Sequence, residues 1–179
     1  VRGTLGTMVP VAVAGHRAVV GGDGLHILDV ARTDGPVEVA RLDTSGQVRG
    51  LALRGDLAFV SDSVDGLVVL SLAEPAQRLG TLAGVGAGRL YLRGDHLYIL
   101  EQQATGANTV RLVDVSKPAS PSDVLGGEST YAVLRGTVDL ALIDGLIVGA
   151  RGTTVAVADV TSPFWPQVRA EYESAWPLV

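Results

Sequence analysis

The sequence contains no cysteine and is poor in aromatic residues, in lysine and in long apolar runs. Without cysteine the chain forms no disulfide and performs no thiol chemistry, so cysteine usage says nothing about its compartment. Only 4% of the 179 residues are aromatic although 47% are hydrophobic, so we expect a core built from Val, Leu, Ala and Ile. No uncharged apolar run approaches the roughly 18 residues that a membrane helix needs, and no basic, apolar signal segment opens the sequence. We therefore expect no membrane span.

Positive charge is also scarce, and what there is does not cluster. The chain has 13 arginines, a single lysine and a net charge of −5. A nucleic-acid-binding protein is expected to carry a basic patch or stripe. The composition therefore predicts that nucleic acid is not a partner.

The feature that recurs along the chain is an apolar run that ends on Asp or Ser and one further apolar residue. Its clearest copy is VRLVDVSKP, and the other three are LHILDVART, LVVLSLAEP and VAVADVTSP. Aligned on the last apolar residue, they place Val30, Leu72, Val115 and Val160 in one column, with spacings of 42, 43 and 45 residues. A fixed period of this length indicates a repeat architecture.

Both faces of these repeated strands are apolar. Three positions before the aligned column lie Ile27, Val69, Leu112 and Val157, and two positions before it lie Leu28, Leu70, Val113 and Ala158. Neighbouring residues of a strand point to opposite faces of the sheet. The strands are therefore predicted to be packed between other sheets on both sides.

Each repeat contains four short apolar segments separated by turn residues. In the first repeat these segments are Val9–Gly15, Arg17–Gly22, Leu25–Val30 and Val37–Leu42. The first turn of the successive repeats holds Gly15, Gly55, Gly94 and the pair Asp144-Gly145. Tight hairpins need a positive φ, which Gly, Asn and Asp tolerate. Four-stranded antiparallel units of about 40 residues are typical of β-propeller blades.

The predicted fold is therefore all-β, a single β-propeller region with four four-stranded blades, at residues 8–43, 44–83, 84–126 and 127–179. Residues 1–7 resemble the end of the second repeat and are expected to form the outer strand of a preceding blade. The last blade is expected to include the start of a further connection. Since every repeat already has its own outer strand, we expect these blades to be part of a larger ring and the chain to be cut from a longer protein.

The third repeat departs from the others. An inserted loop is expected near 104–108 and a weaker fourth strand near 123–125, and the segment GGESTYAVLRG before the fourth repeat is assigned to no element.

The segments GLHILDV, GLVVLSL and TVRLVDVSKPASP resemble the LVIVD repeat, a blade-type repeat of bacterial and archaeal proteins that are often surface-exposed. Its pattern runs Gly-Leu-x-Ile-x-Asp-Val-Ser-x-Pro, and the second copy departs from it with Ser71 and Leu72 in place of Asp-Val. The resemblance implies a non-catalytic binding or scaffolding propeller that mediates protein-protein or cell-surface interactions. It also implies an extracellular, periplasmic or cell-surface location.

Candidate catalytic and metal-binding residues are few. Asp29, Asp114 and Asp159 share a column and could form a ring of carboxylates, but an Asp before a turn more often bonds the backbone N–H groups of that turn, and Ser71 in the same column fits that role. The three histidines are far apart in sequence, unlike the ligands of a zinc site. We predict no catalytic residue and no resident metal.

Calcium is the one cofactor that a motif suggests. In the segment SDSVDG, Asp62 and Asp65 precede Gly66 at close spacing and could offer hard oxygen ligands. The spacing does not match a full EF-hand loop, so a solvated turn is the preferred interpretation.

Polar residues also recur at the start of the first strand of each repeat. Arg49, Arg89 and Asp139 share this column with Val9. In a propeller these positions lie at the mouth of the central channel. Two arginines there could grip a carboxylate or phosphate in a bidentate manner. Alternatively, they pair with Asp139 or nearby loop acids and seal the channel, which is the role we favour.

The channel mouth is the predicted partner-binding face. The residues that we expect there with Arg49, Arg89 and Asp139 are Asp62, Asp65, Glu101, Gln102 and Arg151. Mixed charges and an amide at a concave mouth suit a protein or peptide partner. The outer strands carry charged residues that solvate the rim, namely Glu38, Arg41, Arg78, Arg169 and Glu171.

Two functional classes follow from these observations. The first is a binding or scaffolding propeller, whose partners are a protein or peptide and, in addition, further blades of the same or a longer chain. The alternative is a propeller enzyme or metal-dependent protein with a site built from loops at the channel mouth. Substitution of both Arg49 and Arg89 by alanine is expected to weaken partner binding, whereas substitution of Arg41 and Arg169 is not.

Overall fold

The computed structural model describes residues 9–32, 34–102, 108–124, 134–162 and 164–176, which form four antiparallel four-stranded sheets. The first sheet contains β1 (Val11–Ala14), β2 (Arg17–Gly21), β3 (Leu25–Asp29) and β4 (Val37–Leu42). The second contains β5 (Val48–Arg54), β6 (Leu57–Asp62), β7 (Gly66–Ser71) and β8 (Gln77–Leu82). The third contains β9 (Gly88–Arg93), β10 (His96–Glu101), β11 (Thr109–Asp114) and β12 (Ser122–Asp123). The fourth contains β13 (Asp139–Ile143), β14 (Leu146–Arg151), β15 (Thr154–Asp159) and β16 (Gln167–Glu173).

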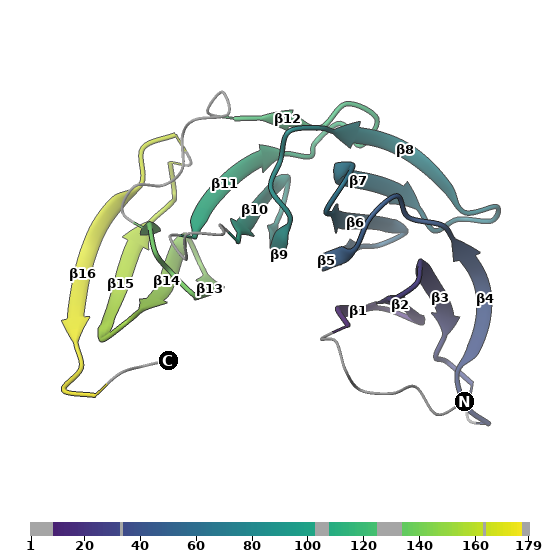
Figure 1. Cartoon of the computed structure of the whole chain (residues 1–179), viewed down its shortest axis with the longest axis horizontal. Helices are drawn as coiled ribbons and strands as arrows, with labels where there is room; N and C mark the ends of the chain where they lie inside the picture. The colour runs from purple at the N-terminus through teal and green to yellow at the C-terminus, as the bar shows by residue number, and fades with distance from the viewer. Residues whose placement is uncertain (1–8, 33, 103–107, 125–133, 163, 177–179) are drawn as a thin grey trace.

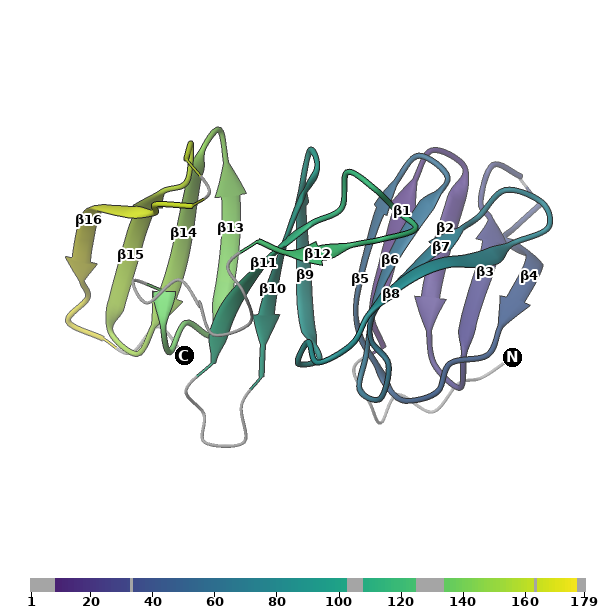
Figure 2. The ribbon, with the colours of Figure 1, turned by 90° about the horizontal axis from the view of Figure 1, so that it is seen from above.

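The four sheets follow one another around an open arc (Figure 1). In each sheet the strands are paired in sequence order, so every sheet is a simple meander. The first strands β1, β5, β9 and β13 lie on the concave side, and the last strands β4, β8, β12 and β16 lie on the convex side (Figure 1). Seen from above, the sheets stand side by side like blades (Figure 2). The prediction of an all-β propeller with four four-stranded blades is confirmed.

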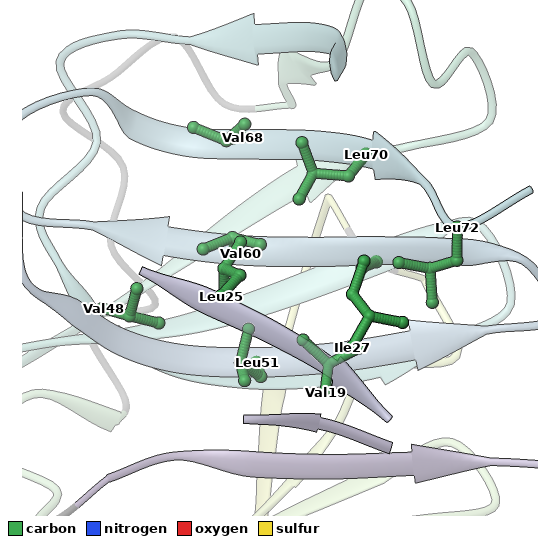
Figure 3. Packing of buried hydrophobic residues seen from close by; sticks show 10 residues of the cluster. Val19, Leu25, Ile27, Val48, Leu51, Val60, Val68, Leu70 and Leu72 are labelled. Atoms are coloured by element: carbon green, nitrogen blue, oxygen red, sulfur yellow. The ribbon is translucent and has the colours of Figure 1, made fainter. Parts of the chain in front are cut away.

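The core consists of three apolar layers, one between each pair of neighbouring sheets. Between the first two sheets, Val19 and Ile27 pack against Leu51, Val60 and Leu70 (Figure 3). The next layer joins residues of the second and third sheets, including Phe59, Val69, Leu97 and Ile99. The last joins the third and fourth sheets through Tyr98, Leu112, Ile147 and Ala158. Adjacent residues such as Val69 and Leu70 thus enter different layers, which confirms the predicted burial on both faces.

The Asp or Ser side chain near the end of the third strand caps the turn that follows it in each sheet. Asp29 accepts a hydrogen bond from the backbone N–H of Ala31 at 2.9 Å, and Asp114 accepts one from Ser116 at 2.8 Å. Asp159 does the same with Thr161 at 2.9 Å, and the hydroxyl of Ser71 with Ala73 at 3.2 Å. These side chains are therefore turn caps, as predicted.

The hairpin turns also match the expectation from the sequence. Gly15, Gly55 and Gly94 have φ values of 56°, 55° and 54°, and Asp144 and Gly145 have 27° and 88°. These are left-handed conformations that glycine adopts without steric cost and that Asp tolerates.

Three of the four outer strands contain an irregularity of register at the same position. Between the third and fourth strands the register shifts at Ile27/Leu28, at Val69/Leu70 and at Val157/Ala158, which are equivalent positions of the first, second and fourth sheets. A β-bulge increases the local twist of a strand. The bulge therefore curves each of these outer strands around the rim at the same place.

Several predicted elements fall where the structure differs or is not described. The weak outer strand of the third sheet is observed at Ser122–Asp123 rather than 123–125. Residue 125, the predicted strand at 1–7, most of the inserted loop and most of the unassigned segment lie outside the described residues. In the fourth sheet β16 pairs with β15, so the outermost position of this sheet is occupied by a strand of the same repeat.

Candidate functional site

A hollow of about 310 Å³ lies on the concave side of the arc, where the inner strands of the first three sheets meet. We call it the inner-strand hollow. Its lining residues come from three successive sheets and are Val9, Pro10, Val11, Arg49, Gly50, Leu51, Arg89, Leu90 and Tyr91. Two of the three predicted channel-mouth residues of the first-strand column, Arg49 and Arg89, are therefore brought together here.

The close approach of β5 and β9 depends on glycine. A Cβ atom built on Gly50 would lie 2.2 Å from the backbone oxygen of Gly88, which is closer than real Cβ atoms approach any backbone atom. Only glycine allows the two inner strands to pack at this distance. This packing places Arg49 and Arg89, which adjoin the two glycines in sequence, in the same hollow.

Arg89 is bound to the inner strand of the next sheet. Its Nη1 lies 2.9 Å from Oδ1 of Asp139, and the hydroxyl of Tyr91 donates to the same carboxylate oxygen at 2.6 Å. Partial burial opposes ionisation of Asp139, but the hydrogen bonds from Tyr91 and Arg89 outweigh it and hold the pKa of Asp139 below its ordinary value. The pairing expected of a sealing role is thus present between the third and fourth sheets.

Arg49 differs from Arg89 in having no such partner. Its side chain is exposed, and within the described part of the chain its guanidinium makes neither a hydrogen bond nor an ion pair. The apolar residues Val9, Pro10 and Leu51 also line the hollow. One guanidinium without a described partner therefore stands beside a second that is paired with Asp139.

Asp62 is a structural residue, contrary to its predicted place in the binding face. Only 1% of it is exposed, and its carboxylate accepts three backbone hydrogen bonds, from Gly46 at 3.0 Å, Val64 at 2.8 Å and Asp65 at 2.9 Å. The expectation of a solvated turn is wrong for this residue. Its side chain turns inward because it satisfies backbone donors of the connection between β4 and β5 and of its own turn.

Asp65 and Arg151 also point elsewhere than the inner-strand hollow. The carboxylate of Asp65 accepts hydrogen bonds from the hydroxyl of Ser45 at 2.8 Å and from Arg78 at 2.9 Å, and these lower its pKa. Arg151 pairs with Glu171 of β16 at 2.6 Å. The predicted channel-mouth residues therefore do not form one group. Arg49 and Arg89 line the inner-strand hollow, whereas Asp65 and Arg151 pair with residues of the outer strands.

Glu101 lies in a buried charged network, which we call the Arg111 network. Arg111 Nε lies 2.5 Å from Glu101 and its Nη1 lies 2.7 Å from Asp123. Glu101 also accepts hydrogen bonds from Thr109 at 3.1 Å and from the backbone of Gly86 at 2.8 Å. The side chains of Glu101 and Arg111 are only 3% and 14% exposed. These contacts join the outer strand of the third sheet to the connection that enters it.

The five outer-strand residues that were predicted to solvate the rim are engaged in ion pairs. The pairs are Glu38 with His26, Arg41 with Asp23, Arg78 with Asp65, Arg169 with Asp159, and Glu171 with Arg151. The rim is charged as predicted, but these charges also tie the outer strands to the second and third strands of their sheets and to the turns between them. Arg41 and Arg169 are therefore unsuitable as neutral control positions.

His26 sits at the centre of one of these clusters. Its Nδ1 lies 2.8 Å from Glu38 and its Nε2 lies 3.0 Å from Asp23, which also binds Arg41. The hydrogen bonds to Glu38 and then to Asp23 raise the pKa of His26 above its ordinary value. The pKa is thus higher in the folded chain than in the unfolded one. The cluster therefore stabilises the fold fully below about pH 6.5, and this stabilisation is lost as the pH rises through the raised pKa.

This linkage gives a testable prediction. Substitution of His26 by glutamine is expected to lower the free energy of unfolding more at about pH 5.5 than at about pH 9. The reason is that only the protonated ring carries a positive charge that attracts the two carboxylates. Urea unfolding of both proteins at the two pH values measures the difference. A loss of equal size at both pH values would show that the ring acts by packing and not by charge.

The described residues contain no group of three or more His, Asp or Glu side chains placed to hold a metal ion. No helix among them is long and apolar enough to span a membrane.

The chain can be compared with known proteins at this point. The model of the LVIVD repeat matches residues 45–77 and 86–125, which contain the second sheet up to the start of β8 and the third sheet. No curated protein matches the sequence.

Several solved structures share the fold. A functionally unknown protein from Desulfotomaculum acetoxidans DSM 771 is 12% identical with a TM-score of 0.72, over 94% of this chain and 56% of that one. A putative 6-phosphogluconolactonase from Bacteroides fragilis NCTC 9343 is 13% identical with a TM-score of 0.67, over 93% and 55%. The computationally designed Ika4 protein is 14% identical with a TM-score of 0.60, over 97% and 94%.

These identities support a likeness of fold alone. The chain spans about half the length of several propeller-like structures that it matches, with 49%, 56% and 43% of three of them covered. The chain therefore carries the LVIVD repeat in its second and third sheets, on a fold of the propeller type, which confirms the resemblance seen in its sequence.

Proposed function

We propose that this chain is a binding propeller whose inner-strand hollow takes a carboxylate group of a protein or peptide partner. The observation that carries the proposal is Arg49, an exposed guanidinium without a described partner, at the edge of a hollow that it shares with Arg89. A guanidinium binds a carboxylate with two parallel hydrogen bonds, which gives both affinity and orientation. The proposal extends to an extracellular, periplasmic or cell-surface location, which the family resemblance supports.

The lining of the hollow narrows the chemistry of the ligand. Val9, Pro10, Leu51 and Leu90 offer apolar surface beside the guanidinium of Arg49. Arg89 already shares its charge with Asp139, so the hollow suits one negative charge better than several. A glutamate or aspartate next to an aliphatic residue fits this pattern, because the acid reaches Arg49 while its neighbour covers the apolar floor.

The test uses labelled short peptides that pair one glutamate with one leucine, together with the same peptides carrying glutamine instead. Fluorescence polarisation should show that the wild-type chain prefers the glutamate peptides. Arg49→Ala should weaken this binding by about tenfold or more, since a hydrogen bond to a charged group contributes roughly 1.5–3 kcal/mol. Arg49→Ala combined with Arg89→Ala should weaken it further.

The matched control is Arg32→Ala. Arg32 is an exposed arginine that pairs with Asp34 in the loop between β3 and β4, outside the hollow. It should leave peptide binding unchanged. Equal binding of the glutamate and glutamine peptides, or an equal loss from Arg32→Ala, would contradict the proposal. The alternative, an enzyme or metal-dependent protein, stays a prediction that no described cluster of residues favours.

A further inference from the structure

Exposed apolar side chains gather in the two end sheets of the arc. Of the twelve large hydrophobic residues that are exposed among the described residues, eleven belong to the first or fourth sheet or to the segments beside them, and only Val64 belongs to the second. The eleven are Val9, Val11, Val13, Val37, Val39, Ile143, Phe164, Trp165, Val168, Tyr172 and Trp176. Contiguous exposed apolar surface marks an interaction site. Four of the eleven, Val11, Val13, Ile143 and Tyr172, lie by strand alternation on the free faces of the two end sheets.

The free face of the fourth sheet is equivalent to faces that are buried elsewhere in the chain. In the second sheet, Phe59 and Val69 pack against the third sheet. By strand pairing, the equivalent positions of the fourth sheet are Val148 and Val157. The residues of this face, which we call the trailing face, are Ala141, Ile143, Val148, Ala150, Val155, Val157, Ala170 and Tyr172. These eight residues are uncharged, and Asp159, which alternation places on the same face at the end of β15, is paired with Arg169.

The free face of the first sheet is the matching partner. In the second sheet, Leu51 and Leu70 pack against the first. Their equivalents in the first sheet are Val11, which also borders the inner-strand hollow, and Leu28. Leu28, Val13 and Val20 alternate with residues that pack on the second sheet, so they point away from it. We call this the leading face. It offers the kind of aliphatic surface that fills the internal layers.

The polar corner of the leading face is consistent with packing against a sheet. His26 occupies the position that Arg111 occupies in the third sheet, on the face of that sheet that is turned toward the second sheet. There the Arg111 network is satisfied internally and buried. The cluster of His26, Asp23 and Glu38 is likewise hydrogen-bonded within its own sheet, and Asp23 also pairs with Arg41.

We propose that two copies of this chain close a ring, in which the trailing face of β13–β16 of each copy packs on the leading face of β1–β4 of the other. The arc is open in Figure 1, and it covers 49%, 56% and 55% of three solved structures of similar fold. Two such arcs would together span about the length of one of those structures. A twofold axis then creates two identical contacts between unlike faces, and the assembly closes instead of polymerising. The proposal is independent of the ligand assigned to the inner-strand hollow.

The mass of the purified 179-residue chain in solution tests this proposal. Light scattering during size exclusion should give twice the chain mass of 18.5 kDa. Val157→Arg on the trailing face and Val13→Arg on the leading face should each reduce the mass to that of one chain, because an unpaired charge would be buried in the contact. Val64→Arg is the matched control, since Val64 is 69% exposed and lies in the turn between β6 and β7. It should leave the mass unchanged.

Mixing the two variants distinguishes unlike from like contacts. A mixture of Val13→Arg and Val157→Arg retains one intact contact, so a species of twice the chain mass should return in part, although neither variant forms it alone. Circular dichroism of each variant establishes that it is folded. A monomeric wild-type chain would overturn the proposal. That result is expected if the natural occupant of the two faces is a further sheet of a longer chain. An open series of higher oligomers, or a pair broken by only one of the two substitutions, would also overturn it.

Discussion

Substitution of Arg111 by methionine is expected to lower the free energy of unfolding by about 3–5 kcal/mol, the cost of removing one partner from a buried ion pair. Arg111 contacts both Glu101 and Asp123, and the side chain of Glu101 is 3% exposed. Without the guanidinium, the Glu101 carboxylate would keep, among the described residues, Thr109 and the backbone of Gly86 as donors. Urea unfolding followed by circular dichroism measures the loss.

The double variant Arg111→Met with Glu101→Gln is the control for this mechanism. It removes the buried charge together with its partner, so it should recover part of the stability lost by Arg111→Met alone. If instead Arg111→Met costs less than about 1 kcal/mol, as an exposed ion pair would, the network does not hold the third sheet together.

Phe59→Ala should cost a similar amount, about 3–5 kcal/mol, because it opens a cavity in the layer between the second and third sheets. Phe59 is fully buried and packs in the same cluster as Leu97 and Ile99. The guanidinium of Arg54 also lies 5.5 Å from its ring centroid, a cation–π contact that the substitution removes. The measurement is again the free energy of unfolding in urea.

The chain contains a second phenylalanine that serves as a matched control. Phe164 is 54% exposed and lies between β15 and β16. Phe164→Ala should change the free energy of unfolding by no more than about 0.5 kcal/mol. Losses of equal size at the two positions would contradict the layered core, because they would mean that burial between sheets contributes nothing at Phe59.

The strands and turns could be predicted from sequence because they depend on local pattern. The column that contains Val69 and Leu112 fixes both the repeat period and the faces of the third strands. The turn at Gly55 is predictable because a positive φ there excludes most other residues. The short β12 was placed one residue late, since a strand of two residues, Ser122–Asp123, leaves no alternating pattern to read.

The candidate site was only partly predictable. Arg49 and Arg89 were found because equivalent strand positions recur around the arc. Asp62 was misplaced because sequence gives the end of a strand but not whether its side chain turns inward to backbone donors. Tyr91 was missed, although its place two residues after Arg89 on the same strand puts both side chains on one face.

The role of Arg49 can be measured most directly by nuclear magnetic resonance of the arginine Nε–H groups during titration with the glutamate-leucine peptide. Arg49 has no described partner, whereas Arg89 and the rim arginine Arg41 are bound to carboxylates. The signal of Arg49 should therefore move first and furthest, that of Arg89 should follow, and that of Arg41 should stay in place. Movement of the Arg41 signal with an unchanged Arg49 signal would contradict a binding site in the inner-strand hollow.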